Sequence, residues 1–355
     1  MNISCHHKFP KNMKSFLYTL SAIFAVSIVG CSNSDSSSTS SNCSSGFTQP
    51  AAPSVQYSLV TVGNPGNSAD ITGFGAVNYA YQIGKYDVTI AQYTAFLNAV
   101  AKTDANGLYN TNMTTDLNIA GITRSGTSGS YIYSVMNNGG DSSNKPIAYV
   151  SWFNAARFSN WMSNGQPSGS QSSSTTENGA YDLSTAANGM AVPKNTCNPN
   201  TGAAVAYWIP TENEWYKAAH YSPTINNTGS PGYYLYATQS SASPGNTIGN
   251  AANQMNVILG INFSVTQVAT LSATQNYLTN VGAFTGSASY YGTYDQNGNL
   301  YQWNDLDGTA SAYRGARGSM WFAGTQAAQS ILYAGYTPSH SGLDVGFRLA
   351  SFLNQ

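Results

Sequence analysis

The chain of 355 residues is long enough for one large domain or two average ones, and its composition excludes several classes of protein. Hydrophobic residues make up 41% of it, which is too many for a disordered chain, while charged residues make up only 8%. All 14 acidic residues follow Cys31 but only 10 of the 13 basic ones do, so this part carries 10 minus 14, or −4. The sequence contains no cluster of Lys and Arg that could neutralise several phosphates, and this argues against a nucleic-acid partner.

Residues 1–30 have the pattern of a secretory signal peptide. Basic residues precede an apolar run at 16–29, which is too short to span a membrane comfortably. The ending SIVGC resembles the cleavage motif of bacterial lipoproteins, so Cys31 is expected to carry the lipid; an ordinary cleaved signal is the alternative. We therefore expect an exported protein anchored to the cell envelope, and Ser32 favours the outer membrane. Translation can begin at the first methionine or at Met13.

Residues 31–54 are rich in serine and predict a flexible tether. Residues 55–355 predict one domain, since no repeat of fixed period and no second linker divides them. Cys43 lies in the tether and Cys197 in a loop rich in Pro, Asn and Gly. In an oxidising compartment these two cysteines can form a disulfide, but the sequence does not establish that they are close. Neither has a neighbouring basic residue that would activate a thiolate.

Three helices are predicted from capping residues and apolar spacing. The first follows Thr89, the second runs from Ser151 to a stop at Gly165, and the third begins with a capping box of Thr211 and Glu214. Apolar residues recur at helical spacing in each. The remainder predicts short strands and long Gly/Asn/Ser loops, which are uncommon in a compact domain unless they serve a function.

Six segments together resemble the formylglycine-generating enzyme family, the sulfatase-modifying factor domain. They follow the family's order and are YQIGKYDVTIAQYTAFL (81–97), PIAYVSWFNAARFSNWM (146–162), WIPTENEWYKAAHY (208–221), YGTYDQNGNLYQW (291–303), RGARGSMW (314–321) and GFRLA (346–350). The resemblance implies a single α+β domain of the C-type-lectin-like kind, rich in loops, with about three helices, short antiparallel strands and a core rich in Trp. The six tryptophans fall in or beside these segments, where large aromatic rings can hold loops together. Arg348 is expected to pair with a carboxylate or with carbonyl groups.

The same resemblance raises the question of oxidase activity. Family members that generate formylglycine oxidise a substrate cysteine at a copper ion held by two cysteine thiolates, which lie between the last two segments. Residues 319–345 of this chain contain no Cys. Because thiolates are the ligands that select Cu(I), the sequence argues against copper and against this reaction.

Other catalytic arrangements have weaker support. An iron site of two His and one carboxylate would need His220, His340 and an acid such as Asp344, but His220 ends the third helix and is expected at the surface or as a cap. No G-x-S-x-G elbow of a hydrolase occurs. Glu212 and Glu214 are expected to serve as helix caps and dipole partners rather than as an acid–base pair.

The segment YDQNGNLYQW matches a calcium site of the family. The resemblance places ligands at Asp295, Gly298, Leu300 and Gln302, the second and third through backbone carbonyls, which suits the oxygen ligands of calcium. Family members usually have Glu where Gln302 stands, so we expect weakened binding of a structural calcium ion. The alternative is an ion-free type I′ hairpin at Asn297 and Gly298.

Three functions remain open. The first is a non-catalytic binding module for a protein, peptide or glycan ligand at the cell surface, which explains the anchor, the tether and the absent cysteines together. The second is an oxidoreductase of the sulfatase-modifying class with an altered metal site, and the third is a structural envelope lipoprotein. For the binding module, the residues expected to contact the ligand are Trp321, Phe322, Tyr333, Tyr336 and His340.

Overall fold

The computed structural model describes residue 43 and residues 55–225, 228–305 and 313–353. Residues Ser40–Gln355 form one compact unit. The predicted signal peptide, the lipid attachment at Cys31 and most of the predicted tether lie outside the described residues. Within the described ranges, no helix is both long and apolar enough to span a bilayer.

The described residues contain four α-helices, three of which match the predicted ones. Thr89 and Thr211 each form a capping box, with Gln92 and Glu214, and the Ser151 hydroxyl accepts from a backbone N–H in the first turn. The short second helix has no side-chain cap. The helices are α1 (Ile90–Val100), α2 (Asn112–Thr115), α3 (Trp152–Ser163) and α4 (Glu212–His220), and a 3-10 helix, η2, covers Thr325–Ala328.

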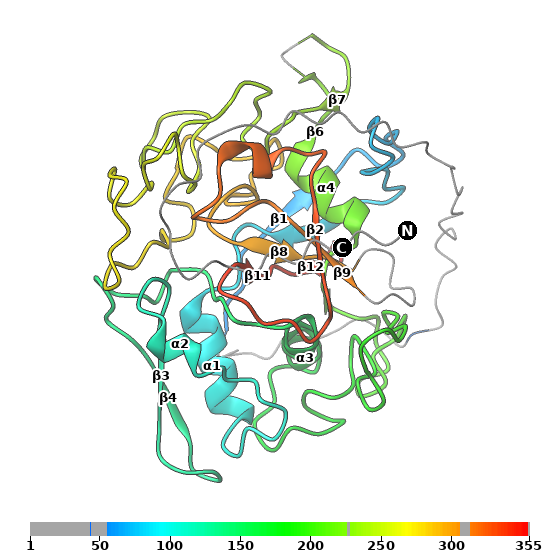
Figure 1. The fold of residues 1–355 in the computed structure, drawn as a ribbon. Coiled ribbons are helices and arrows are strands. Elements are labelled where there is room, and N and C mark those ends of the chain that lie inside the picture. Colours follow the sequence, from blue (N-terminus) through cyan, green and yellow to red (C-terminus); the bar gives the residue numbers. More distant parts are fainter. Residues whose placement is uncertain (1–42, 44–54, 226–227, 306–312, 354–355) are drawn as a thin grey trace. The chain divides into compact units, whose positions relative to one another are not determined.

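Two four-stranded sheets lie among long loops (Figure 1). Sheet one has the order β1-β2-β12-β5, with β1 at Leu59–Val62, β2 at Tyr81–Gly84, β12 at Ala350–Ser351 and β5 at Tyr207–Trp208. Sheet two has the order β10-β9-β8-β11, with β10 at Ala334–Tyr336, β9 at Arg314–Arg317, β8 at Tyr301–Trp303 and β11 at Val345–Gly346. Two small pairs are β3 (Ile122–Ser125) with β4 (Ile132–Val135) and β6 (Tyr221–Ser222) with β7 (Gly232–Tyr233).

The predicted α+β fold with short strands is confirmed. Among the described strands all pairs are antiparallel except β8 with β11, which is parallel and therefore departs from the expectation. Each sheet joins strands from distant parts of the chain: β12 pairs with both β2 and β5. Sheet one thus combines β1 and β2, from early in the described residues, with β5 and with β12 from near their end, and long loops run between these short strands.

The core is built on aromatic side chains, as the sequence predicts. All six tryptophans are buried. Phe158 of α3 packs edge-on against Phe96 of α1 (ring centres 5.2 Å apart) and against Phe347 (5.4 Å). These contacts join α1 and α3 to the segment between β11 and β12, which explains how a chain with little regular structure holds its loops.

Cys43 and Cys197 form a disulfide across 154 residues of sequence, with their Cα atoms 5.5 Å apart. The sequence left this pairing open. The bond attaches Cys43, in the segment that precedes the domain, to the loop after residue 195.

Candidate functional site

Arg317 on β9 is a buried cation that orders the segment leading into β10. Its Nε donates to the Glu212 carboxylate of α4, and its Nη1 donates to the carbonyl oxygens of Ser330 (2.7 Å) and Leu332 (3.0 Å). Burial raises the pKa of Glu212, and the Arg317 charge opposes that shift. Charge-assisted hydrogen bonds to two carbonyls fix the backbone just before β10.

Tyr333 lies over this guanidinium and still faces solvent. Arg317 Cζ is 5.4 Å from the ring centre of Tyr333, 5.0 Å from that of Phe74 and 4.9 Å from that of Tyr216. Such cation–π contacts contribute about 0.5–1 kcal/mol at exposed sites. Tyr333 is 62% exposed. The structure therefore presents the Tyr333 ring at the surface, where its contact with the buried Arg317 guanidinium fixes its position.

Tyr333 belongs to a group of exposed residues that we call the edge strip: Tyr313, Ile331, Leu332, Tyr333 and Gly335. β10 is an edge strand of sheet two, and Ile331 and Leu332 just before it are 51% and 44% exposed. Tyr313, just before β9, is 47% exposed, and a Cβ built on exposed Gly335 would lie 3.6 Å from its Cβ. Exposed apolar side chains that gather at one edge mark an interaction surface more often than scattered ones do.

A second group of side chains lies at the end of β10. Tyr336 stacks on His340, with ring centres 4.4 Å apart and planes at 10°. The Tyr336 hydroxyl donates to Asp344 Oδ2 (2.6 Å), and His340 Nε2 lies 3.4 Å from Asp344 Oδ1. Burial alone would raise the pKa of Asp344, but the hydrogen bonds from His340 and Tyr336 hold it below its ordinary value. Because side chains alternate along a strand, Tyr336 points away from the face of Gly335 and lies outside the edge strip.

Backbone strain borders this second group. Tyr149 has a φ of 61°, a left-handed conformation that a bulky residue rarely adopts. Its N–H donates to the Gly342 carbonyl (3.0 Å) and its hydroxyl donates to Asp116 Oδ2 (2.7 Å). Two hydrogen bonds therefore hold the strained residue against the turn between His340 and Asp344.

Trp321 and Phe322 lie in a third place. Trp321 stacks on Tyr277 (ring centres 4.9 Å apart, planes at 10°) and contacts Phe263 and Phe322 at 5.9 and 4.7 Å. Trp321 is buried and Phe322 is partly buried. The structure thus assigns the Trp321 ring to the core rather than to an open surface. The five residues expected to bind the ligand therefore lie in three separate places. Tyr333 is the most exposed of the five.

Sequence reasoning missed four members of the edge strip, Tyr313, Ile331, Leu332 and Gly335. The run Ile331-Leu332-Tyr333 offered a signal, because three consecutive apolar residues cannot all face the core of a strand. It also missed Arg317 as the support beneath Tyr333, since nothing in the sequence pairs Arg317 with Glu212.

The loop before β8 carries three of the residues of the expected calcium site, and Gln302 lies on β8 itself. Asp295 and Asn299 have φ values of 57° and 65°, whereas Asn297 does not enter the left-handed region, so the type I′ turn considered as the alternative is not formed. Gly298 has a φ of 79°, and a Cβ there would lie 2.6 Å from the carbonyl oxygen of Asn256. Only glycine fits this close approach of two backbone segments.

Gln302 on β8 is buried and joins this loop to the core. Its Nε2 donates to the backbone carbonyl of Asp295 (2.5 Å). Its Oε1 accepts from Trp215 Nε1 (2.7 Å) and from Arg348 Nε (2.7 Å). Arg348 also donates to the Asp87 carboxylate at 3.1 Å. The predicted pairing of Arg348 with a carboxylate is confirmed.

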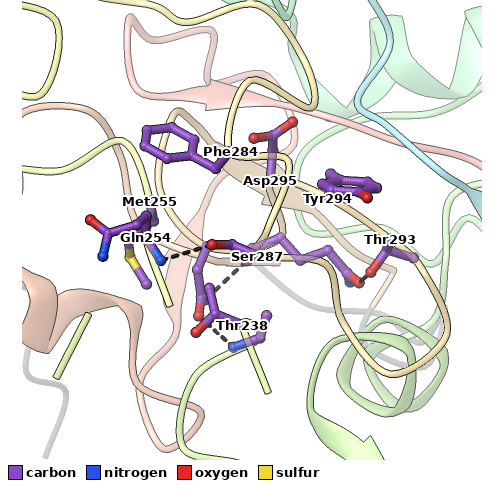
Figure 2. A pocket seen from close by; sticks show the side chains of 11 residues that line it. Thr238, Gln254, Met255, Phe284, Ser287, Thr293, Tyr294 and Asp295 are labelled. Carbon is purple, nitrogen blue, oxygen red and sulfur yellow. Dashed lines mark hydrogen bonds between the residues drawn. The ribbon is translucent and has the colours of Figure 1, made fainter. Parts of the chain in front are cut away.

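Asp295 is one of the residues that line a small pocket, together with Thr238, Ser287 and Thr293, and Figure 2 shows its side chain between those of Phe284 and Tyr294. The pocket has room for about one water molecule. Asp295 Oδ2 accepts from the Gly282 N–H (2.6 Å). Burial raises the pKa of Asp295 to about 6, against the opposing effects of the Gly282 N–H and the Arg348 charge.

Residues 74–353 match the family model described as the sulfatase-modifying factor enzyme 1-like domain. The chain belongs to this family. No protein of curated function matches its sequence.

Several solved structures are similar to this sulfatase-modifying factor domain. They include CarF (18% identity, 84% of this chain and 99% of that chain, TM-score 0.47) and Treponema denticola variable protein 1 (16% identity, 84% and 96%, TM-score 0.45). PvdO from Pseudomonas aeruginosa is a third (15% identity, 84% and 92%, TM-score 0.39).

The histidine and acid residues of this sulfatase-modifying factor domain do not converge. His220 is buried, so its expected place at the surface is wrong: it packs against Tyr216 (ring centres 5.0 Å apart), and its side chain does not reach solvent. His340 instead contacts Trp303 and Tyr336. Across the described ranges, no three His, Cys, Asp or Glu residues are placed to hold one metal ion.

The two carboxylates at the start of α4 have structural partners. Glu214 accepts from the backbone N–H of Thr211 (2.8 Å), from Trp208 Nε1 (3.0 Å) and from the Tyr79 hydroxyl (2.9 Å). Glu212 is the ion partner of Arg317. Capping by Glu214 confirms its predicted role, whereas Glu212 acts through an ion pair that the sequence did not suggest.

Proposed function

We propose that this sulfatase-modifying factor domain is a non-catalytic, exported binding module that holds a protein ligand at the cell envelope. The edge strip is the observation that carries the proposal. Tyr333, Ile331 and Tyr313 expose aromatic and aliphatic surface together at a sheet edge. Aliphatic side chains beside tyrosines suit a protein surface better than a glycan, whose ring hydroxyls need polar partners next to the aromatic platform.

The energetics favour Tyr333 as the main anchor. Aromatic residues held in a fixed rotamer give a large contact area at small entropic cost on binding. The buried Arg317 guanidinium pre-organises the Tyr333 ring through its cation–π contact. Truncating a residue of this kind at the centre of an interface typically costs more than about 1 kcal/mol, and often about 2 kcal/mol or more.

Export and lipid attachment at Cys31 are part of the same proposal, with the outer membrane as the destination. The disulfide between Cys43 and Cys197 supports it, because structural disulfides persist in oxidising compartments. A tether ahead of the disulfide would let the domain reach partners on neighbouring envelope proteins.

The test begins with a photo-crosslinking amino acid at position 333 of the full-length lipoprotein, expressed in the bacterium that carries it. Position 290 is the matched control, because Tyr290 is exposed to 42% and lies outside the edge strip. A discrete protein should crosslink from 333 and not from 290. That protein is then purified and its affinity is measured for the wild type, Tyr333→Ala, Gly335→Glu and Tyr290→Ala.

Gly335→Glu is informative because a Cβ at Gly335 meets its nearest neighbour at an ordinary contact distance, so the fold should tolerate it. We expect Tyr333→Ala and Gly335→Glu to weaken binding at least about tenfold, which corresponds to about 1.4 kcal/mol, and Tyr290→Ala to leave it unchanged. A partner that binds all four proteins equally would refute the edge strip as the site. Binding to glycans alone would favour the glycan alternative, and metal-dependent oxidation of a cysteine peptide would favour the oxidoreductase.

A further inference from the structure

We infer that Gln302 takes the place of an ion in this chain: its side-chain amide closes the loop between Asp295 and β8, and the loop needs no calcium. This inference is independent of the ligand proposed for the edge strip. It concerns the positions Asp295, Gly298, Leu300 and Gln302, at which the family resemblance implies calcium ligands.

The orientation of the Gln302 amide is decided by its partners. Trp215 Nε1 and Arg348 Nε both lie 2.7 Å from one end of the amide, and both groups can only donate hydrogen bonds. The atom that faces them must therefore be the oxygen. A flipped amide would set an NH2 group against two donors inside the core, which is costly.

It follows that the NH2 group of Gln302 faces the loop. Nε2 lies 2.5 Å from the carbonyl oxygen of Asp295 and donates to it. Calcium binds oxygen lone pairs, and an amide NH2 offers none. An ion between Gln302 and Asp295 would have to displace this hydrogen bond and then approach the hydrogens of the amide.

The charge around Gln302 also opposes a divalent cation. Arg348 is buried, and its guanidinium donates hydrogen bonds to the Gln302 side chain, to the Asp87 carboxylate (3.1 Å) and to the carbonyl oxygen of Tyr294 (2.7 Å). A fixed positive charge already neutralises Asp87. A calcium ion placed beside it would be repelled in a medium of low dielectric constant.

The rest of the loop is held by backbone hydrogen bonds to other segments. The Gly298 N–H donates to Gly318 (2.6 Å), the Asn299 N–H donates to Asn256 (2.9 Å), and the Trp321 N–H donates to the Asn299 carbonyl (2.9 Å). The turn is thus anchored on two sides by protein groups, and Gln302 supplies the remaining closure.

The deciding variant is Gln302→Glu in the full-length protein. One carboxylate oxygen can keep the hydrogen bonds from Trp215 and Arg348. The other would face the Asp295 carbonyl oxygen, and two acceptors repel unless a cation or a proton lies between them. Gln326→Glu adds the same charge at an exposed position of η2 and serves as the matched control.

Melting temperatures are measured for the three proteins with a calcium chelator and with millimolar calcium, and the calcium content of the purified wild type is determined. We expect a wild type without bound calcium whose melting temperature is the same in both solutions. Gln302→Glu should melt several degrees lower in chelator, recover saturably with calcium, and recover in part on acidification, because a protonated carboxyl can donate to Asp295. Gln326→Glu should behave as the wild type does.

Stoichiometric calcium in the wild type, or a saturable rise of its melting temperature with calcium, would overturn the inference. So would a Gln302→Glu protein that is as stable as the wild type in chelator, since the amide would then not close the loop. If Gln302→Glu fails to fold, the wild-type measurements alone decide the question.

Discussion

Replacing His220 with Gln should remove a large part of the protein's sensitivity to acid. Burial lowers the pKa of His220 to about 3, and the nearby Arg317 charge adds to this effect. The folded state therefore keeps His220 neutral, whereas the unfolded chain protonates it at its ordinary pKa of about 6.5. The stability that follows is fully present above pH 6.5 and is lost as the pH falls toward 3.

The magnitude follows from the shift. Each pH unit below 6.5 costs about 1.4 kcal/mol until the folded pKa is reached, so at pH 4.5 the wild type loses about 3 kcal/mol through His220 alone. Gln is neutral at every pH and can occupy a similar volume. The free energy of unfolding is measured by urea denaturation from pH 8 to pH 4.5 for the wild type and His220→Gln, and the difference between the two cancels the titration of all other groups.

That difference should shift by about 3 kcal/mol in favour of His220→Gln between pH 8 and pH 4.5. A difference that stays constant across this range would show that His220 protonates in the folded protein as easily as in the unfolded chain. The burial of the His220 side chain near the Arg317 charge would then not describe the protein in solution.

Two further predictions concern stability. Cys197→Ser should lower the free energy of unfolding by about 2–5 kcal/mol, because it opens a disulfide that spans 154 residues, and the reduced wild type should match it in the same urea titration. Arg348→Met should lower the free energy of unfolding by about 3–5 kcal/mol, because it leaves the Asp87 carboxylate buried without its partner. Arg124→Met, which breaks a partly exposed pair with Asp104, should lower it by less than about 1 kcal/mol. Both are measured in thermal melts, and equal losses would contradict the buried network.

Much of the fold follows from local patterns in the sequence. The caps at Thr89, Ser151 and Thr211 depend on residues within one helical turn, so the sequence alone predicts them. The order of the six family segments predicts the architecture, and the family model covers the same region. Arg348 in its strand-like context correctly predicts a paired arginine.

The candidate site depends on contacts between distant residues, and the sequence could not supply them. Trp321 and Tyr333 are both aromatic residues in one glycine-rich stretch, yet one stacks on Tyr277 in the core and the other lies over Arg317 at the surface. The position of His220 at the end of the third helix suggested the surface, but the structure buries its side chain near the charge of Arg317, which is 97 residues away in the sequence.

The sequence by itself determined three of the helices, because capping and apolar periodicity act over short separations, and it determined the family, because the six segments keep the family's order. The tertiary structure alone decided which side chains meet. Gln302 receives hydrogen bonds from Trp215, 87 residues before it, and from Arg348, 46 residues after it. Because hydrogen bonds and burial depend on neighbours in space, the orientation of that amide and the exposure of Tyr333 were fixed only when the distant segments packed together.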